Sequence, residues 1–266
     1  MNSKSGHIQS AAIVGAGNVG TALAVALRRA GVEVRAVWSR CAANAEALAR
    51  RVEAVAAADL RSMSERADVC IIAVSDNAIA DVAQRLALGP ATVVHTSGGT
   101  SIDVLRRFEH RGVVYPFQTF SKGVNIDFGR VPVMVEAGCA DDERRLLDLA
   151  DQLSAKTMLA GSEQRLALHV AAVLAANFSN HLIALASEYL NSHGIDPTLL
   201  HPLLRQTVDK ACTMPPLAAQ TGPAARHDTA TIGRHLEAIS GTELADIYQL
   251  LTESIIRHHP IKNQKH

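Results

Sequence analysis

The chain has 266 residues, enough for one large or two ordinary domains, and 48% of them are apolar, so a substantial core can form. Its 26 Lys and Arg residues balance 26 Asp and Glu residues, and aromatic residues make up only 3% of the chain. These values argue against a basic or base-stacking surface for nucleic acid and against attraction to an anionic membrane.

The cysteines and the apolar segments bear on the compartment. Cys41, Cys70, Cys139 and Cys212 lie far apart, with no Cys-x-x-Cys pair and no histidine at ligand spacing. We expect small buried or half-buried residues in a reducing cytoplasm, with no disulfide and no metal site. Residues 166–187 lack Asp, Glu, Lys and Arg, but His169, Asn177 and Asn180 would be costly in lipid. We therefore expect a cytoplasmic protein without a membrane span.

A strand, a glycine turn, a helix and a second strand are predicted near the N-terminus. The apolar run 11–14 ends at Gly15-Ala16-Gly17-Asn18-Val19-Gly20, an intact Gly-x-Gly-x-x-Gly; residues 21–30 have helical spacing up to Gly31, and residues 32–38 form a second strand. In this fingerprint the first glycine permits the bend, the second admits a pyrophosphate and the third allows close helix packing. We predict that all six residues hold a dinucleotide; the alternative is a turn with no ligand.

The end of the second strand indicates which dinucleotide. NAD sites usually place an acidic residue there, about 20 residues after the glycines, whereas NADP sites favour an arginine. Here Ser39 and Arg40 follow Trp38, and no acidic residue occurs until Glu46. Ser39 and Arg40 are predicted to bind a 2′-phosphate, which favours NADP over NAD. Arg40 as an exposed arginine at a helix start remains open.

Strands and helices alternate as far as residue 160. Beyond the first strands we predict further strands at 52–57, 68–74, 92–95, 112–115, 131–136 and 156–159, and helices at 42–51, 78–88 and 141–153. This order predicts an α/β fold with a doubly wound, mainly parallel sheet that binds ligands at the carboxyl ends of its strands. Two further loops should reach the cofactor there, through Val74, Ser75 and Asn77 and through Ser97.

From Gly161 onward the pattern predicts helices alone, at 163–192, 197–212, 229–239 and 242–258. The predicted domains are 1–160, a nucleotide-binding Rossmann domain, and 161–266, an all-helical domain for substrate binding and dimerisation.

A polar stripe is predicted on the long helix. At 100° per residue, His169, Asn177 and Asn180 share one side of it, opposite a face of small residues. Uncharged polar groups on an apolar helix favour a cavity where a substrate satisfies them, although paired core residues are the alternative. The small-residue face suits helix packing within the domain or across a dimer.

Several segments together carry a resemblance to a known family. GAGNVG, AVSDNAI, HTSGGTSIDVL, YPFQTFSKG, HVAAVLAANFSNHL and TGPAARHDTATIGRHL resemble Rossmann-like proteins with a C-terminal DUF2520 domain. More distantly, the chain is similar to pyrroline-5-carboxylate reductase, to F420-dependent NADP oxidoreductases and to β-hydroxyacid dehydrogenases. The resemblance implies the fold, an NAD(P) site and a homodimer through the helical domain, but no substrate.

The chain departs from the dehydrogenase pattern in its long helix. In β-hydroxyacid dehydrogenases a lysine, with an asparagine one turn later, performs the acid–base and positioning work. His169 stands where the lysine would be, Val173 replaces the asparagine, and Asn177 or Asn180 would have to substitute. The segment 221–226 resembles, without sharing its motif, the glycine- and threonine-rich loop with which pyrroline-5-carboxylate reductases bind their substrate's carboxylate.

Candidate catalytic residues are His169, His95 and Asn177. His169 is the first candidate for the proton donor, because imidazole titrates near neutral pH, and a packed histidine is the alternative. His95 is the second; it ends a strand beside the expected nicotinamide, and a loop or cap role is the alternative. A turn-capping role is likewise open for Ser97.

Candidate substrate-binding residues are polar groups in two loops and on the long helix: Gln118, Thr119, Lys122, Asn180, Gly222 and Arg226. Lys122 and Arg226 are the charges best placed for a carboxylate or phosphate. A solvated lysine is the alternative for Lys122. Two roles are open for Asp228: it pairs with Arg226, or it caps the helix that starts at Thr229.

Two functions stay open. The first is an NADP-dependent oxidoreductase that transfers hydride to or from a small carbonyl, imine, alcohol or amine substrate between the domains. The second is a non-catalytic NADP(H)-binding sensor or scaffold.

Overall fold

The computed structural model describes residues 6–124 and 126–260. The chain divides into two compact units, Met1–Ala176 and Asn177–His266. The predicted boundary after residue 160 stays a prediction, and residues 1–5 and 261–266 of the predicted domains lie outside the described residues.

An eight-stranded sheet forms the first unit's framework, in the order β3-β2-β1-β4-β5-β6-β7-β8. Its strands are β1 (Ser10–Val14), β2 (Glu33–Trp38), β3 (Val55–Ala56), β4 (Val69–Ile72), β5 (Thr92–His95), β6 (Arg111–Pro116), β7 (Val133–Ala137) and β8 (Thr157–Leu159). All neighbouring strands pair in parallel except β6 and β7. The prediction of a doubly wound, mainly parallel sheet is confirmed, with its switch point between β1 and β4.

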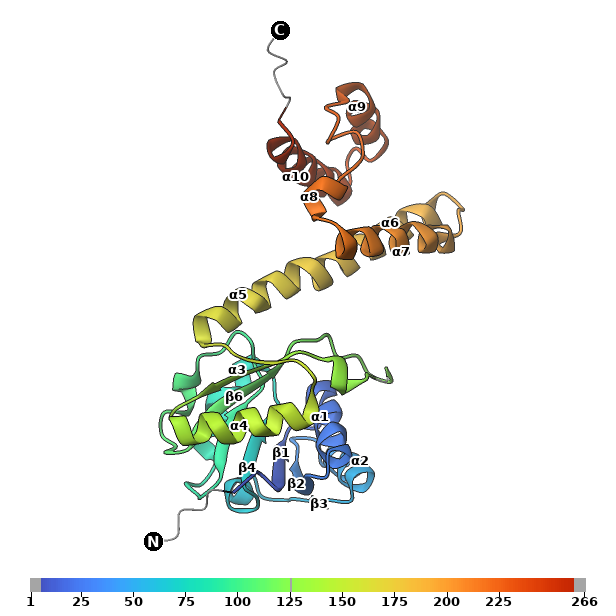
Figure 1. Cartoon of the computed structure of the whole chain (residues 1–266). Coiled ribbons are helices and arrows are strands. Elements are labelled where there is room, and N and C mark those ends of the chain that lie inside the picture. Colours follow the sequence, from blue (N-terminus) through green and yellow to red (C-terminus); the bar gives the residue numbers. More distant parts are fainter. Residues whose placement is uncertain (1–5, 125, 261–266) are drawn as a thin grey trace. The chain divides into compact units, whose positions relative to one another are not determined.

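Helices cover both faces of this sheet (Figure 1). One core joins the sheet to α1 (Asn18–Arg29), α2 (Ala42–Val52) and α4 (Ala140–Leu153). The other joins it to α3 (Asp76–Arg85) and to the 3₁₀ turns η1 (Arg61–Glu65) and η2 (Ile102–Leu105). A third such turn, η3 (Phe128–Arg130), follows β6. Because helices cover both faces of the sheet, all four residues of β4, Val-Cys-Ile-Ile, are buried, and its sequence is continuously apolar and does not alternate with polar residues.

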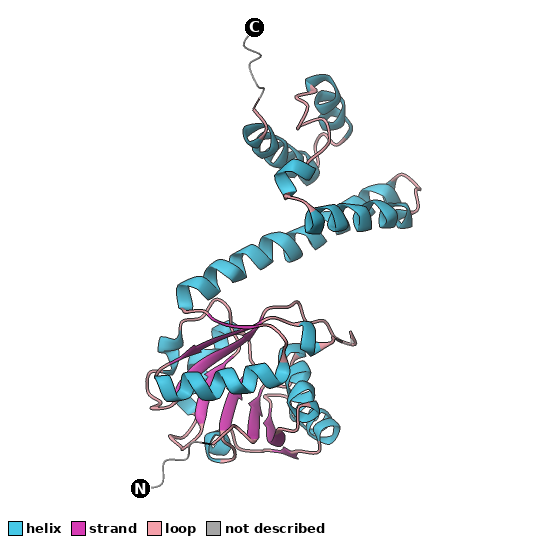
Figure 2. Cartoon of the chain, viewed as in Figure 1, coloured by secondary structure: helices cyan, strands magenta, loops and turns pink. Residues whose placement is uncertain are grey.

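After β8 the described chain is helical, as Figure 2 shows. The elements are α5 (Ser162–Ala172), a π-helical segment η4 (Val173–Phe178), α6 (Ser179–Ser192), the 3₁₀ turn η5 (Pro197–Leu199), α7 (Leu200–Thr213), α8 (Pro216–Ala219), α9 (Thr229–Ala238) and α10 (Glu243–His258). Sequence periodicity missed α8, which is only one turn long, and it missed η4. The wider turn of a π-helix changes the 100° spacing over Val173–Phe178, and the predicted polar stripe from His169 to Asn180 stays a prediction.

Within the described residues, one stretch, Ser162–Ser192, is long and apolar enough to cross a membrane on length and composition, with a mean hydropathy of 1.5. One such helix is weak evidence for a span. Its second turn carries Arg165, which is buried against the sheet domain.

The cysteines differ from expectation. Cys70 is buried in β4, but Cys41, Cys139 and Cys212 are exposed, so the prediction of burial is wrong for these three. Cys41 and Cys139 occupy N-cap positions, where a helix begins at the domain surface. The burial of Cys70 raises the pKa of its thiol to about 12, which makes it inert.

Candidate cofactor and active site

The glycine loop that leads from β1 into α1 contains two glycines at which a Cβ would clash with the backbone and one that faces open space. Gly15 has φ +114°, and a Cβ there would stand 2.2 Å from the Ala73 carbonyl oxygen. A Cβ on Gly20 would stand 2.0 Å from the Gly15 carbonyl oxygen. A Cβ on Gly17 would meet no atom within 4 Å. Packing therefore explains Gly15 and Gly20, whereas Gly17 leaves bare backbone at a helix N-terminus, as an incoming phosphate requires.

A second loop lies beside the first. The Asn18 side-chain amide donates to the Phe120 carbonyl oxygen over 2.9 Å, which ties the segment after β6 to the start of α1. Gly17, Asn18 and Lys122 help to line a groove of about 870 Å³ there. Of the predicted substrate residues in this segment, Lys122 is exposed and Gln118 accepts the Thr119 amide proton over 2.8 Å.

The residues predicted to select NADP lie where β2 ends. Arg40 is exposed, and the Ser39 hydroxyl accepts from the Cys41 amide over 3.4 Å at the entry to α2. Cys41, not Arg40, occupies the N-cap of α2.

The loop after β4 meets the glycine loop at the switch point. The Val74 side chain would lie 3.1 Å from a Cβ on Gly15. Ser75 is the N-cap of α3 and Asn77 lies in its first turn, both exposed. Residues predicted separately thus reach the same edge of the sheet.

The loop after β5 is buried and bonded within itself. His95 is fully buried and its Nδ1 accepts the Ser97 amide proton over 3.2 Å. Burial, with the charge of Arg165 adding to it, lowers the pKa of His95 to about 4, so the ring is neutral at pH 7. The Ser97 hydroxyl accepts from the Gly99 and Thr100 amides over 3.1 and 3.0 Å. The turn-capping alternative for Ser97 is confirmed.

A tyrosine and a histidine face each other beside this loop. Tyr115 Oη lies 3.4 Å from His169 Nδ1, and the rings meet edge to face. A Cβ on Gly98 would stand 2.6 Å from Tyr115 Cζ, so the ring requires a glycine there. A Cβ on Gly99 would stand 3.6 Å from His169 Cδ2 and 3.5 Å from Asp76 Oδ2. Burial, and then the charge of Asp76, raises the pKa of Tyr115.

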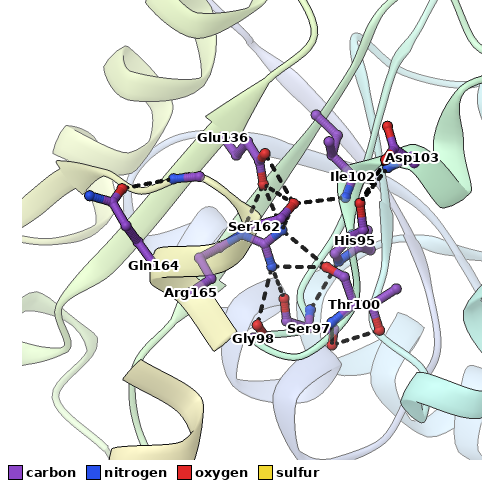
Figure 3. A network of polar contacts seen from close by, with 12 residues as sticks. His95, Ser97, Gly98, Thr100, Ile102, Asp103, Glu136, Ser162, Gln164 and Arg165 are labelled. Carbon is purple, nitrogen blue, oxygen red and sulfur yellow. Dashed lines mark hydrogen bonds and ion pairs between the residues drawn. The ribbon is translucent and has the colours of Figure 1, made fainter. Parts of the chain in front are cut away.

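A buried arginine underlies the same loop (Figure 3). Arg165 on α5 pairs with Glu136 on β7 at 2.6 Å and also donates to the carbonyl oxygens of Ser97, Gly98 and Thr100. Its charge is therefore committed to protein acceptors, and another cation would be needed to bind an anionic substrate.

Four predicted residues belong to the second unit. Asn177 is the penultimate residue of η4 and Asn180 lies on α6, and both are exposed. Gly222 and Arg226 lie in the loop before α9. Their part in the site stays a prediction. The Asp228 carboxylate caps α9 by accepting the Thr231 amide proton over 3.0 Å, which confirms the capping alternative. That bond, with Arg226 nearby, lowers the pKa of Asp228.

The fold also brings together His110, Cys139 and Asp142, a trio that no sequence spacing indicated. Asp142 is fully buried and already accepts from the Arg111 amide, the Thr92 hydroxyl and the Cys139 thiol. It also lies in the first turn of α4, where the helix dipole disfavours a cation. These contacts describe a structural hydrogen-bond network.

Sequence reasoning missed Tyr115 and Arg165. Tyr115 lies one residue before the end of β6, which is next to β5, and adjacent parallel strands have their carboxyl ends at one edge of the sheet, so its position was a usable signal. Arg165 is the last charged residue before a long uncharged stretch, and a charge beginning such a stretch suggests a buried pairing.

Comparisons with known proteins place the chain in a family. Residues 3–118 match the Rossmann-like domain model, and residues 131–255 match the DUF2520 model, a domain of unknown function. No curated protein matches the sequence.

Solved structures match over almost the whole chain. A candidate NADP oxidoreductase, BF3122 from Bacteroides fragilis, is 38% identical, with a TM-score of 0.88 and coverage of 94% of this chain and 98% of that one. Protein TM1727 from Thermotoga maritima is 24% identical, with a TM-score of 0.72 and coverage of 94% and 98%. A reductive aminase from Aspergillus terreus in complex with NADPH and ethyl-5-oxohexanoate is 20% identical, with a TM-score of 0.69 and coverage of 94% and 93%. The last two likenesses show the fold alone. The fold, the two matching models and the 38% identity establish that the chain belongs to the family that joins a Rossmann-like domain to a DUF2520 domain.

Proposed function

We propose that the protein is an NADP-dependent oxidoreductase that transfers hydride between a nicotinamide and the carbonyl or imine carbon of a small substrate. The observation that carries the proposal is the open face of Gly17 between two glycines fixed by packing. Similarity to the Bacteroides fragilis protein, at 38% identity, supports the same class of reaction.

The residues present suit a dinucleotide. In this proposal the amides of the loop from Gly15 to Gly20 hold the pyrophosphate at the N-terminus of α1. Ser39 and Arg40 bind the 2′-phosphate, and Val74, Ser75 and Asn77 line the opposite side. Bound NADPH supplies the hydride, and the protein's own groups orient the substrate and handle the proton.

His169 is proposed as the group that exchanges a proton with the substrate. The raised pKa of Tyr115 keeps its hydroxyl protonated at pH 7, so it can donate to His169 Nδ1. This bond directs the proton of a neutral imidazole to Nε2 and fixes the orientation of the ring. His95, neutral, buried and bonded to Ser97, is the weaker candidate.

For the substrate we propose a small molecule with a carboxylate. Arg165 is already bonded to Glu136 and to the loop, so Arg226 beside Gly222 remains our candidate for binding this group. Asn177 and Asn180, together with Gln118, Thr119 and Lys122, are proposed to complete the pocket.

We also propose a homodimer through the helical domain. Five apolar residues spaced four apart are 38% to 58% exposed in the single chain: Leu166, Val170, Leu174, Phe178 and Leu182. An exposed apolar row of this length is typical of a surface that another protein chain covers.

The test is NADPH oxidation, followed by absorbance, with paired panels of cyclic imines and ketones, each with and without a carboxylate; the ketones with a carboxylate include 2-oxo acids. We expect turnover with at least one compound and its loss in His169→Gln. NADPH binding without oxidation across both panels would contradict the enzyme and favour a sensor. Equal rates with and without the carboxylate would contradict the substrate class.

A further inference from the structure

Arg165 is fully buried and carries a charge, which is costly unless the charge is paired and every N–H is bonded. Its Nη2 and Nε donate to Glu136 Oε2 over 2.6 and 3.1 Å. This ion pair connects the second turn of α5 to β7.

The same guanidinium holds the loop after β5 (Figure 3). Nη1 donates to the carbonyl oxygens of Ser97 at 2.7 Å, Gly98 at 3.4 Å and Thr100 at 3.1 Å, and Nη2 donates to Thr100 at 3.0 Å. A planar fork that binds three carbonyl groups and a carboxylate fixes their relative positions more tightly than a lysine could. The loop carbonyls therefore point toward Arg165.

Ser162, in the first turn of α5, holds the far end of the loop. Its hydroxyl donates to Glu136 over 2.9 Å and accepts the Ile102 amide proton over 3.3 Å. Ser162, Arg165 and Glu136 together form a clasp around residues 97–102.

The clasp connects the two segments that carry His169 and Gly99. His169 follows Arg165 by one helical turn, so the two residues lie on the same side of α5. Gly99 lies on the loop that Arg165 holds, and a Cβ there would stand 3.6 Å from His169 Cδ2. Displacement of the clasp would move His169 relative to Gly99 and Tyr115.

We propose that Arg165 is a positioning residue that sets the placement of His169 beside Tyr115 and Gly99 through its bonds to the loop carbonyls and Glu136. The inference rests on the proposed role of His169 in proton exchange. If Arg165 has this role, its replacement changes the environment of the His169 ring and lowers kcat, and another substitution that lowers stability equally does neither.

The test compares wild type with Arg165→Lys, which keeps the charge but has only three N–H donors, too few to bond the three carbonyl groups and the Glu136 carboxylate at once. The first readout is the NMR signal of the His169 ring, followed through a pH titration and assigned by its absence in His169→Gln. The others are the NADPH affinity, and kcat and KM for a substrate that the NADPH-oxidation panels identify. We expect a shifted His169 signal and titration midpoint, and a kcat lower by about tenfold or more at nearly constant KM, because small displacements of catalytic groups have large rate effects. A wild-type titration and kcat in a folded Arg165→Lys protein would overturn the proposal.

The matched control is Arg145→Lys, at the opposite end of β5, where Arg145 Nη1 donates to the Thr92 hydroxyl over 3.1 Å. It should lower stability without moving the His169 signal; an equal shift there would contradict a specific clasp. Should Arg165→Lys fail to fold, Ser162→Ala removes one hydroxyl from the clasp and should shift the His169 signal in the same direction, and no shift would count against the proposal. The NMR comparison needs no cofactor, so it can succeed or fail independently of NADPH binding.

Discussion

Replacement of Gly17 by alanine should separate cofactor binding from folding. The backbone of Gly17 is extended, with φ −80° and ψ −168°, which alanine adopts without strain. A Cβ there meets no protein atom within 4 Å. Alanine lowers the entropy of the unfolded chain, which stabilises by roughly 0.4–1 kcal/mol, but it is a poorer N-cap than glycine by a similar amount, so we expect stability to change by less than about 1 kcal/mol.

The same methyl group would occupy the space where we propose that the pyrophosphate approaches the loop. We expect NADPH affinity to fall at least about tenfold, or roughly 1.4 kcal/mol. Calorimetric titration and thermal unfolding of the same preparation measure the two effects.

Gly20→Ala is the matched control, because its Cβ would stand 2.0 Å from the Gly15 carbonyl oxygen. It should lose roughly 1–3 kcal/mol of stability through overpacking, with weaker binding as a consequence. Unchanged NADPH affinity in a stable Gly17→Ala protein would refute the assignment of this loop to the cofactor.

Three further predictions follow from contacts described above. Tyr115→Phe removes the hydroxyl that faces His169 Nδ1, and we expect a shifted pH profile of kcat with little change in NADPH affinity; an unchanged profile would exclude Tyr115 from this role. The pKa of His95 falls from 6.5 unfolded to about 4 folded, so the unfolded chain binds the extra proton and stability should fall as pH drops from 6.5 toward 4, by up to about 3 kcal/mol. Urea unfolding should show a weaker pH dependence in His95→Asn, whose amide oxygen can still accept from Ser97; an equal slope would exclude His95 as its source. Phe178→Glu should shift the mass measured by light scattering toward the monomer, and a dimer of unchanged stability would argue against this surface.

Much of the fold could be predicted because its signals are local. The apolar run at 68–74 predicted the buried strand β4. The helix was expected to stop at Gly31, and Gly31 adopts φ +84°, as a helix-terminating glycine does. The mainly parallel pairing of the strands followed from their alternation with helices. The 3₁₀ turns were missed because three to five residues carry no readable periodicity.

The candidate site was only partly predictable. The glycine loop has a sequence fingerprint, whereas Tyr115 and Arg165 become relevant through contacts with residues 97–100, far away in the chain. The π-helical segment η4 could not be predicted, because its residues have the same apolar and polar pattern as an α-helix, and the polar stripe stays a prediction. Exposure of Cys41 and Cys139 reflects their N-cap positions, which composition could not reveal.

Titration of NADPH and NADH into wild type and Arg40→Ala by calorimetry tests the central claim most directly. We predict that wild type prefers NADPH and that Arg40→Ala reduces this preference about tenfold or more, because hydrogen bonds to charged groups contribute roughly 1.5–3 kcal/mol. Failure of both nucleotides to bind wild type would contradict the proposed function, and an unchanged preference in Arg40→Ala would contradict the role of Arg40.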